Sequence, residues 1–163
     1  MITAEHLREL LDYSPDTGAF TWKVKKARWL NVGDIAGRIG GGRYWAIKID
    51  GVSYQAHRLA ILWMTGAHPS KHVDHADLDR LNNCWSNLRE CSRSQNQHNL
   101  PKFSSNTSGF KGVNFHKCAR KWRATIRIDG KNVHLGYAAT PELASKLYAD
   151  AAAKYFGEFA RTA

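Results

Sequence analysis

Acidic, imidazole and amide side chains recur at short spacing between positions 72 and 99 of this 163-residue chain. Asp74 and His75 are adjacent, and Asn87 and Asn96 follow them. Imidazole titrates near neutral pH and can take a proton from water, whereas carboxylate and amide oxygens suit Mg²⁺ or Mn²⁺. A base, a group that orients it and a hard cation are what phosphodiester hydrolysis requires. We therefore predict His75 as a general base held by Asn87, with Asp74 and Asn96 as ligands of Mg²⁺ (or Mn²⁺).

The residues around this cluster predict a ββα hairpin. A short strand ends at Asp74 and His75, residues 87–90 return as its partner, and a helix capped by Ser92 carries Asn96. Taken singly, each polar residue has a structural explanation, because Asp and Asn shape turns. We interpret four residues of the connecting loop in that way, namely Asp77, Asp79, Asn82 and Asn83. Four further histidines, His57, His68, His72 and His98, are predicted not to be catalytic.

The combined pattern resembles the HNH endonuclease motif of phage and intron-encoded nucleases, in the variant where Asn replaces the last His. This resemblance implies the same roles for the residues already named: Asp74 and Asn96 as metal ligands, His75 as base and Asn87 as the central Asn. Residues 54–60 (Tyr-Gln-Ala-His-Arg-Leu-Ala) also resemble the helix that leads into the motif. The family's loop often reads Asp-Gly-Asp or Asn-Gly-Asp, whereas Leu78 stands in place of Gly here, which bears on the loop conformation.

The last third of the chain has the periodicity of a β-β-β-α unit. Residues 121–128 alternate, with one face carrying Trp122, Ala124, Ile126 and Ile128 and the other Arg123, Thr125 and Arg127. Strands at 112–116 and 132–137 flank this run, and Asp129-Gly130 predicts a tight turn. Thr140 and Pro141 begin a helix whose apolar stripe is predicted to cover the sheet, and the stripe comprises Leu143, Ala144, Leu147, Tyr148, Ala151, Tyr155 and Phe156.

This segment, Ser108 to Arg161, resembles the plant APETALA/ethylene-response-factor (ERF) type of DNA-binding domain. The matching stretches are residues 111–113, 121–127, 134–137 and 152–157. The resemblance implies that the open face of the sheet lies in the major groove of double-stranded DNA. It assigns DNA contacts to Lys111, Asn114, His116, Arg123, Thr125, Arg127, Asn132 and His134.

Charge supports a polyanionic partner. The formal net charge is +10, and residues 101–163 carry 11 Lys and Arg against 4 Asp and Glu. The bland alternative for this surplus is a solubilising surface. Cys84, Cys91 and Cys118 are odd in number and predict no disulfide framework. A zinc site of His72, His75, Cys84 and Cys91 can be drawn, but its spacing matches no common ligand pattern, and burial of the thiols explains them better.

Together these patterns predict an α+β fold in which an N-terminal domain containing a ββα-metal (HNH) motif joins a C-terminal three-stranded antiparallel sheet packed on one helix. We place the nuclease domain at 1–100, with the motif at 72–99, a linker at 101–108 and the ERF-like domain at 109–163. In the first domain we expect a helix at 3–12 capped by Thr3, a strand at 19–24, a hairpin at 44–54 and a helix at 57–65.

The predicted function is metal-dependent, site-directed cleavage of double-stranded DNA, similar to that of homing endonucleases. A transcription-factor-like DNA binder with a degenerate HNH region is the alternative, and an RNA binder fits the charge but has no stacking platform. Without a leader or an apolar run of membrane length, we expect the protein in the cytoplasm, that of the host cell if a phage encodes it. The pattern does not decide between monomer and homodimer.

Overall fold

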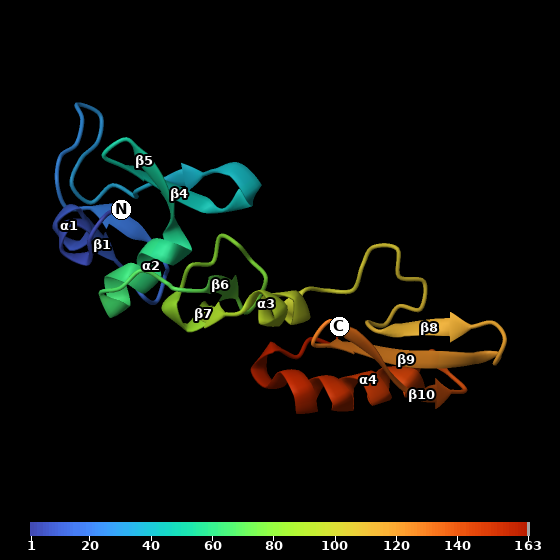
Figure 1. Ribbon diagram of the computed structural model, residues 1–163. Helices are drawn as coiled ribbons and strands as arrows, with labels where there is room; N and C mark the ends of the chain where they lie inside the picture. Colours follow the sequence, from blue (N-terminus) through green and yellow to red (C-terminus); the bar gives the residue numbers. More distant parts are fainter. Residues whose placement is uncertain (163) are drawn as a thin grey trace. The chain divides into compact units, whose positions relative to one another are not determined.

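A computed structural model describes residues 1–162, and Ala163, the last residue of the predicted ERF-like domain, lies outside them. The chain divides into two compact units, Met1–Ser92 and Arg93–Ala163. Both units mix helices with small antiparallel sheets, which confirms the predicted α+β class (Figure 1). The helix at 93–99, which we had assigned to the first domain, groups with the second unit.

No helix within residues 1–162 combines the length and the apolar character needed to cross a membrane.

The first unit contains three small sheets and two helices. In chain order its elements are α1 (Ala4–Leu10), β1 (Leu11–Tyr13), β2 (Phe20–Trp22), β3 (Arg38–Ile39), β4 (Trp45–Ile49), β5 (Val52–Gln55), α2 (Ala56–Thr65), β6 (His72–His75) and β7 (Leu88–Cys91), with 3₁₀ turns at Gly41–Arg43 and Trp85–Asn87. All strand pairs are antiparallel: β1 with β2, β3 with β4 and β4 with β5, and β6 with β7.

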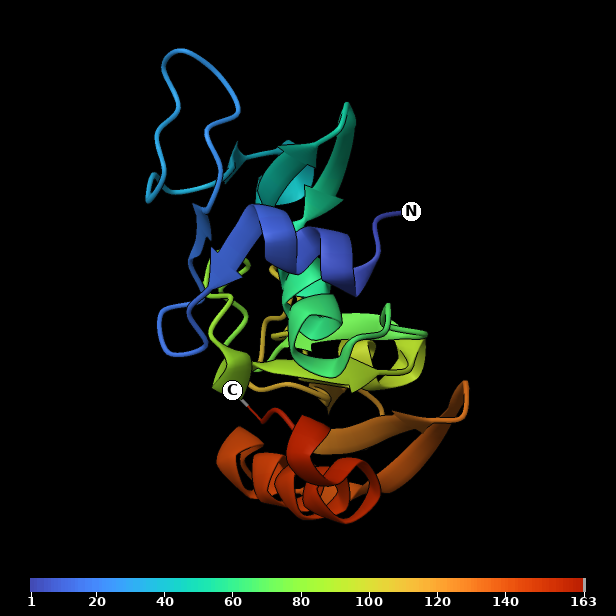
Figure 2. The same cartoon turned by 90° about the vertical axis from the view of Figure 1, so that its left-hand side faces the viewer.

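The core of this unit forms where α1 and α2 lie side by side (Figures 1 and 2). The Thr3 hydroxyl accepts a hydrogen bond from the His6 amide and caps α1 as predicted. Leu7 and Leu11 are completely buried, but Leu11 belongs to β1. The predicted helix therefore ends two residues earlier than expected, because residues 11–13 pair with β2. Here tertiary pairing outweighs the local helical pattern.

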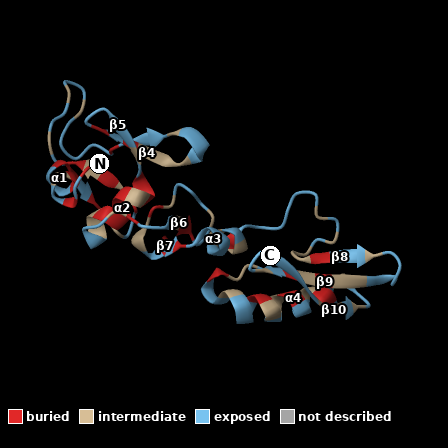
Figure 3. Cartoon of the chain, viewed as in Figure 1, coloured by how far each residue is buried: buried red, intermediate tan, exposed pale blue. Residues whose placement is uncertain are grey.

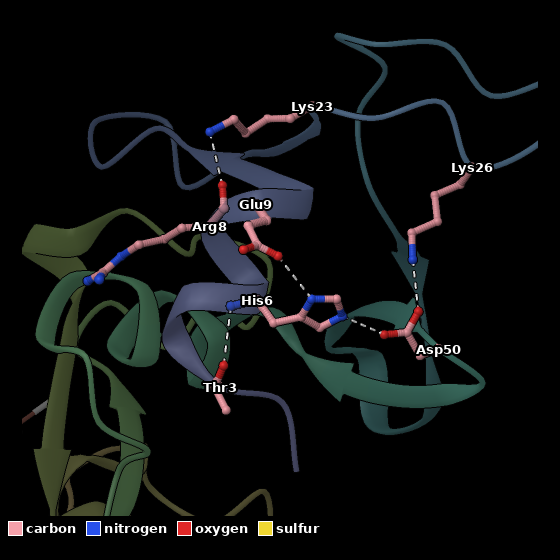
Figure 4. Close-up of polar contacts among 7 residues, drawn as sticks. All are labelled: Thr3, His6, Arg8, Glu9, Lys23, Lys26 and Asp50. Carbon is pink, nitrogen blue, oxygen red and sulfur yellow. Dashed lines mark hydrogen bonds and ion pairs between the residues drawn. The ribbon is translucent and has the colours of Figure 1, made fainter.

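Polar contacts attach α1 to the turn between β4 and β5 (Figure 4). His6 Nε2 lies 2.8 Å from Asp50 Oδ2, and Lys26 Nζ donates to Asp50 Oδ1 at 2.9 Å. Lys23 Nζ donates to the Arg8 carbonyl at the end of α1. The carboxylate of Asp50 raises the pKa of His6, so this contact strengthens as the imidazole becomes protonated.

The second unit contains α3 (Arg93–Asn99), β8 (Val113–His116), β9 (Lys121–Ile128), β10 (Lys131–Ala138), α4 (Pro141–Phe156) and a 3₁₀ turn at Gly157–Phe159. The strands form a sheet of order β10-β9-β8, and α4 packs on one of its faces. Thr140 caps α4 by accepting a hydrogen bond from the Leu143 amide. The predicted three-stranded sheet with one helix is therefore confirmed.

The buried face of α4 is narrower than predicted (Figure 3). Ala144, Tyr148 and Ala152 are buried at four-residue intervals, with Ala151 and Phe156 partly buried beside them. Leu143, Leu147 and Tyr155 were expected in the same stripe, but 48%, 37% and 51% of their surfaces are exposed. A sheet of only three strands covers the line of residues Ala144, Tyr148 and Ala152 along α4. The neighbouring line of Leu143, Leu147 and Tyr155 lies beyond the sheet and faces solvent.

Substitution of two glycines near β8 can distinguish the free-energy cost of an unfavourable backbone conformation from the cost of a steric clash. Gly109 and Gly112 both have positive φ, at 81° and 71°. A methyl group on Gly109 would meet open space, whereas one on Gly112 would overlap the Tyr148 ring and lie 2.6 Å from the Thr125 carbonyl oxygen. We predict that Gly109→Ala costs about 1 kcal/mol of unfolding free energy and that Gly112→Ala costs ~2 kcal/mol more. Urea unfolding measures both, and equal losses would contradict the packing of α4 on this turn.

Candidate active site

Asp74 and His75 end strand β6, and each side chain is only 4% exposed. The register places Asp74 directly opposite Arg89 of β7. The Arg89 guanidinium donates to Asp74 Oδ2 through Nε at 3.0 Å and Nη2 at 2.9 Å. A buried carboxylate needs such a compensating charge. This cross-strand ion pair fixes the end of the hairpin on which the predicted base stands.

The His75 ring is enclosed by side chains from three other segments. His57 of α2 meets it edge-on with ring centroids 5.0 Å apart, and Tyr44 lies 6.1 Å away by the same measure. His75 Nε2 lies 3.4 Å from Asn83 Oδ1, and the Asn83 amide nitrogen donates to the Leu81 carbonyl. Because that oxygen can only accept, the contact favours the tautomer with the proton on Nε2. The lone pair that can take a proton is then on Nδ1.

Burial sets the charge state of both imidazoles. It lowers the pKa of His75, and this effect exceeds the opposing hydrogen bond to Asn83 and the nearby carboxylates of Asp77, Asp74 and Asp79. Burial also lowers the pKa of His57 to about 3, and His57 Nδ1 has no hydrogen-bond partner among the described residues. At neutral pH both rings are therefore uncharged. For His75, that is the form able to act as a base.

Asn87 holds the loop that follows His75. Its amide oxygen accepts from the Asp77 backbone, while its amide nitrogen donates to Asp77 Oδ1 and to the Asn82 carbonyl. Its own carbonyl accepts from the Ala76 amide. Asp77, Asp79 and Asn82 each bond a backbone amide two residues ahead, which is the loop-shaping behaviour expected of them. Leu78 has φ of 71°, so it adopts the left-handed conformation for which glycine is better suited.

The turn between β1 and β2 supports the same loop from the other side. The Tyr13 hydroxyl donates to the Asn83 carbonyl at 2.7 Å, and the Trp85 amide donates to the Pro15 carbonyl at 2.8 Å. Gly18 lies so close to the backbone of residues 83–84 that a Cβ there would overlap it. Sequence reasoning missed this support and also the contacts of His57 and Asn83 with His75. No local pattern signals them, because the partners are 8 to 70 residues apart.

The predicted metal ligands differ in what surrounds them. Asp74 supplies hard carboxylate oxygens beside the base, and a cation at Oδ2 would share that atom with Arg89. Asn96 lies in α3 of the second unit and is partly exposed. Amide and carboxylate oxygens fit a hard divalent cation. Within residues 1–162 no three His, Cys, Asp or Glu side chains lie close enough together to form a metal site. The zinc site considered for His72, His75, Cys84 and Cys91 is therefore not formed.

The strand register collects most of the predicted DNA contacts on the sheet face opposite α4. Cross-strand partners share a face, and the pairs are Asn114 with Arg123, Asn132 with Arg127, and His134 with Thr125, with His116 next to Lys121. Arg123 Nε lies 3.3 Å from the Asn114 side-chain oxygen. Apart from Lys111, every residue that the ERF resemblance assigned to DNA therefore lies on this face.

The positions of Tyr137 and Lys111 are set by features other than simple strand alternation. Leu135 is an extra residue in β10, because His134 pairs with Thr125 and Gly136 with Ala124. This β-bulge reverses the alternation, so Tyr137 joins the open face, where its ring contacts His116 and His134. Lys111 is half-buried, and its ammonium donates to the carbonyls of His98 and Leu100.

Because His57 and His75 are neutral in the folded protein, we expect its free energy of unfolding to fall in acid. Their pKa values are lower in the folded protein than in the unfolded chain, so unfolding takes up protons below pH 6.5 and the free energy of unfolding falls with pH. Between pH 6.5 and 5, His57 alone should account for a loss of about 2 kcal/mol. His57→Phe keeps a ring beside His75 and removes this part of the loss. Urea unfolding at the two pH values measures it, and equal pH dependence in variant and wild type would contradict a neutral His57.

Comparison with known proteins places this site in a family. The family model described as HNH endonuclease matches residues 54–98. Protein 3.8 of Escherichia phage T7 is 32% identical over 90 residues, which cover 55% of this chain and 74% of that protein. The uncharacterized HNH endonuclease L560 of Acanthamoeba polyphaga mimivirus is 31% identical over 145 residues, covering 88% of this chain and 74% of the relative.

The chain is also similar to a solved structure that concerns DNA binding and cleavage by the HNH homing endonuclease I-HmuI. The similarity covers 84% of this chain and 76% of the I-HmuI chain. The TM-score is 0.43 and the identity 21%. The match to the HNH family model, residues 54–98, runs from β5 to the last turn of α3. It therefore includes Asp74, His75, Asn87 and Asn96. The match to the family model and the similarity to L560, which is 31% identical and covered over 74% of its length, show that the chain belongs to the HNH endonuclease family.

Proposed function

We propose that this protein is a metal-dependent, site-directed DNA endonuclease that hydrolyses phosphodiester bonds in the manner of homing endonucleases. The observation that carries the proposal is the buried imidazole of His75, which lies against Asn83 and follows the ion-paired carboxylate of Asp74 at the end of β6. The phage and giant-virus relatives support action in the cytoplasm of a host cell.

In the proposed reaction, the neutral imidazole of His75 accepts a proton from water at Nδ1 as the water oxygen attacks phosphorus. Asn83 at Nε2 and the edge of His57 limit rotation of the ring. Asn87 fixes residues 76–77 directly after the base. As the P–O bond of the scissile phosphate breaks, negative charge develops on the leaving oxygen.

The cation would be held by Asp74 and Asn96, and its chemistry is to stabilise the charge on the phosphate and the leaving oxygen. Two protein ligands make a sparse site, but Mg²⁺ commonly keeps several waters and takes phosphate oxygens as ligands. Arg89 pairs with Asp74 and sets the orientation of the carboxylate. Mn²⁺ has similar ligand preferences and is expected to serve as well.

The ERF-like domain, placed at 109–163, is proposed to dock double-stranded DNA through the open sheet face. That face carries Lys121, Arg123 and Arg127 and no carboxylate. Arginine can contact phosphate or read guanine through two hydrogen bonds, while amide and hydroxyl side chains bond either bases or phosphates. Asn114, His116, Thr125, Asn132 and His134 are the proposed polar contacts, and Tyr137 adds an aromatic ring between the two histidines. Residues 101–108 are the proposed linker.

The base is tested by His75→Ala, with His72→Ala as its control because His72 is exposed on the same strand. We expect the first variant to lose at least about 100-fold in cleavage rate while binding DNA nearly as before, and the second to cut normally. Supercoiled plasmid incubated with Mg²⁺, with Mn²⁺ or with chelator gives the rates, and the proportions of nicked and linear product show whether one or both strands are cut. Normal cutting by His75→Ala would refute the assignment. A wild-type protein that binds but never cuts would support the non-catalytic alternative.

The docking face is tested by the salt dependence of DNA binding. Arg123→Gln combined with Arg127→Gln removes two charges from the open face, whereas Lys146→Gln with Lys154→Gln removes two from α4, which packs on the opposite face. Each phosphate contact that is lost should lower the slope of log affinity against log salt by about 1. We expect a shallower slope for the first pair alone. Equal slopes in the two double variants would exclude this face as the docking surface.

A further inference from the structure

Helix α3, which carries Asn96, is built into the C-terminal module. It groups with residues 93–163 and contacts the turn at Gly157–Phe159. The His98 ring stacks on Phe156, the last residue of α4, with centroids 3.6 Å apart and planes inclined by 12°. Stacking this close restrains the end of α3 against the helix that supports the sheet.

Lys111 makes a second connection between α3 and the module. Its Nζ donates to the carbonyl oxygens of His98 and Leu100, both at 2.6 Å. Carbonyls in the last turn of a helix have no amide partner within it, and a cation there also favours the helix dipole. Burial, with a contribution from Arg161, lowers the pKa of Lys111 to about 8, which leaves the ammonium protonated at neutral pH. Lys111 thus caps the C-terminal end of α3.

The helix needs this support. It has only seven residues, Arg-Ser-Gln-Asn-Gln-His-Asn, none of them aliphatic. An isolated helix of this length is unstable in water, and this one offers no aliphatic side chain to a core. The contacts at His98 and the capping by Lys111 are of the kind that can offset this deficit.

We propose that the C-terminal module positions Asn96 for cation binding by holding α3 through Lys111 and the His98–Phe156 stack. These three residues are positioning residues, and the proposal rests on the proposed nuclease function. The module then contributes to the cleavage step as well as to affinity. In particular, Lys111 acts on the reaction through α3 and not by contact with DNA, which the ERF resemblance implied.

The test compares Lys111→Met with Lys117→Met, a control that removes an exposed charge from the turn between β8 and β9. Losing hydrogen bonds from a charged group should raise amide hydrogen exchange in α3 about tenfold or more in the first variant only. In plasmid cleavage, we expect Lys111→Met to need more Mg²⁺ for half-maximal rate and to have a lower kcat, with an unchanged salt slope of DNA binding. Phe156→Leu keeps an apolar side chain in the core and should show the same pattern more weakly.

The opposite pattern overturns the proposal. If Lys111→Met flattens the salt slope by about 1 and leaves kcat, the Mg²⁺ requirement and α3 exchange unchanged, Lys111 contacts phosphate. If the wild-type protein cuts with neither Mg²⁺ nor Mn²⁺, the nuclease proposal fails. Hydrogen exchange then still decides independently whether Lys111 holds α3, because that measurement requires no activity.

Discussion

The site depends on the desolvation of one imidazole. His75 must stay neutral to act as a base, and its burial beneath His57 and Tyr44 secures this by making the charged form costly. The nearby carboxylates of Asp77, Asp74 and Asp79 favour the charged form, and Arg89 offsets one of them by pairing with Asp74. The hairpin, the loop and α2 can all be understood as parts of this enclosure. Arg58 of α2 contributes by binding the carbonyls of Pro69 and Lys71, where the chain enters β6.

The loop after His75 shows how a short polar segment becomes rigid without a core of its own. Asn87 and the carboxylates of Asp77 and Asp79 satisfy its backbone from within. The β1–β2 turn supports it from outside through Tyr13 and Pro15. Burial raises the pKa of Tyr13, which keeps its hydroxyl a donor to Asn83. This support compensates for the unfavourable backbone conformation of Leu78, where the related motif often has glycine.

The sheet of the C-terminal module packs on α4 with one face and leaves the other face open. One face is buried under a narrow row of α4, and the other presents basic, amide and aromatic side chains. The bulge at Leu135 makes this division asymmetric, because it turns Tyr137 to the open face while Leu135 and Ala138 stay with the core. Lys111 is part of the stretch that resembles the ERF domain, but its ammonium donates to carbonyls at the end of α3. A single module thus carries both an open basic face and the contacts that hold the end of the short helix α3.

Local periodicity in the sequence determined the helices, most of the strands and the adjacency of Asp74 to His75, because these depend on neighbours a few residues away. Alternation along residues 121–128 was enough to separate Arg123 and Arg127 from Ala124 and Ile126. Only the tertiary structure decided that His57 and Asn83 contact His75, that the β1–β2 turn supports the loop after it, and that Leu11 belongs to a strand and not to the helix. It also decided the phase of β10 after its bulge and the position of Lys111. Those outcomes depend on burial and on hydrogen-bond partners distant in the chain, which no local pattern encodes.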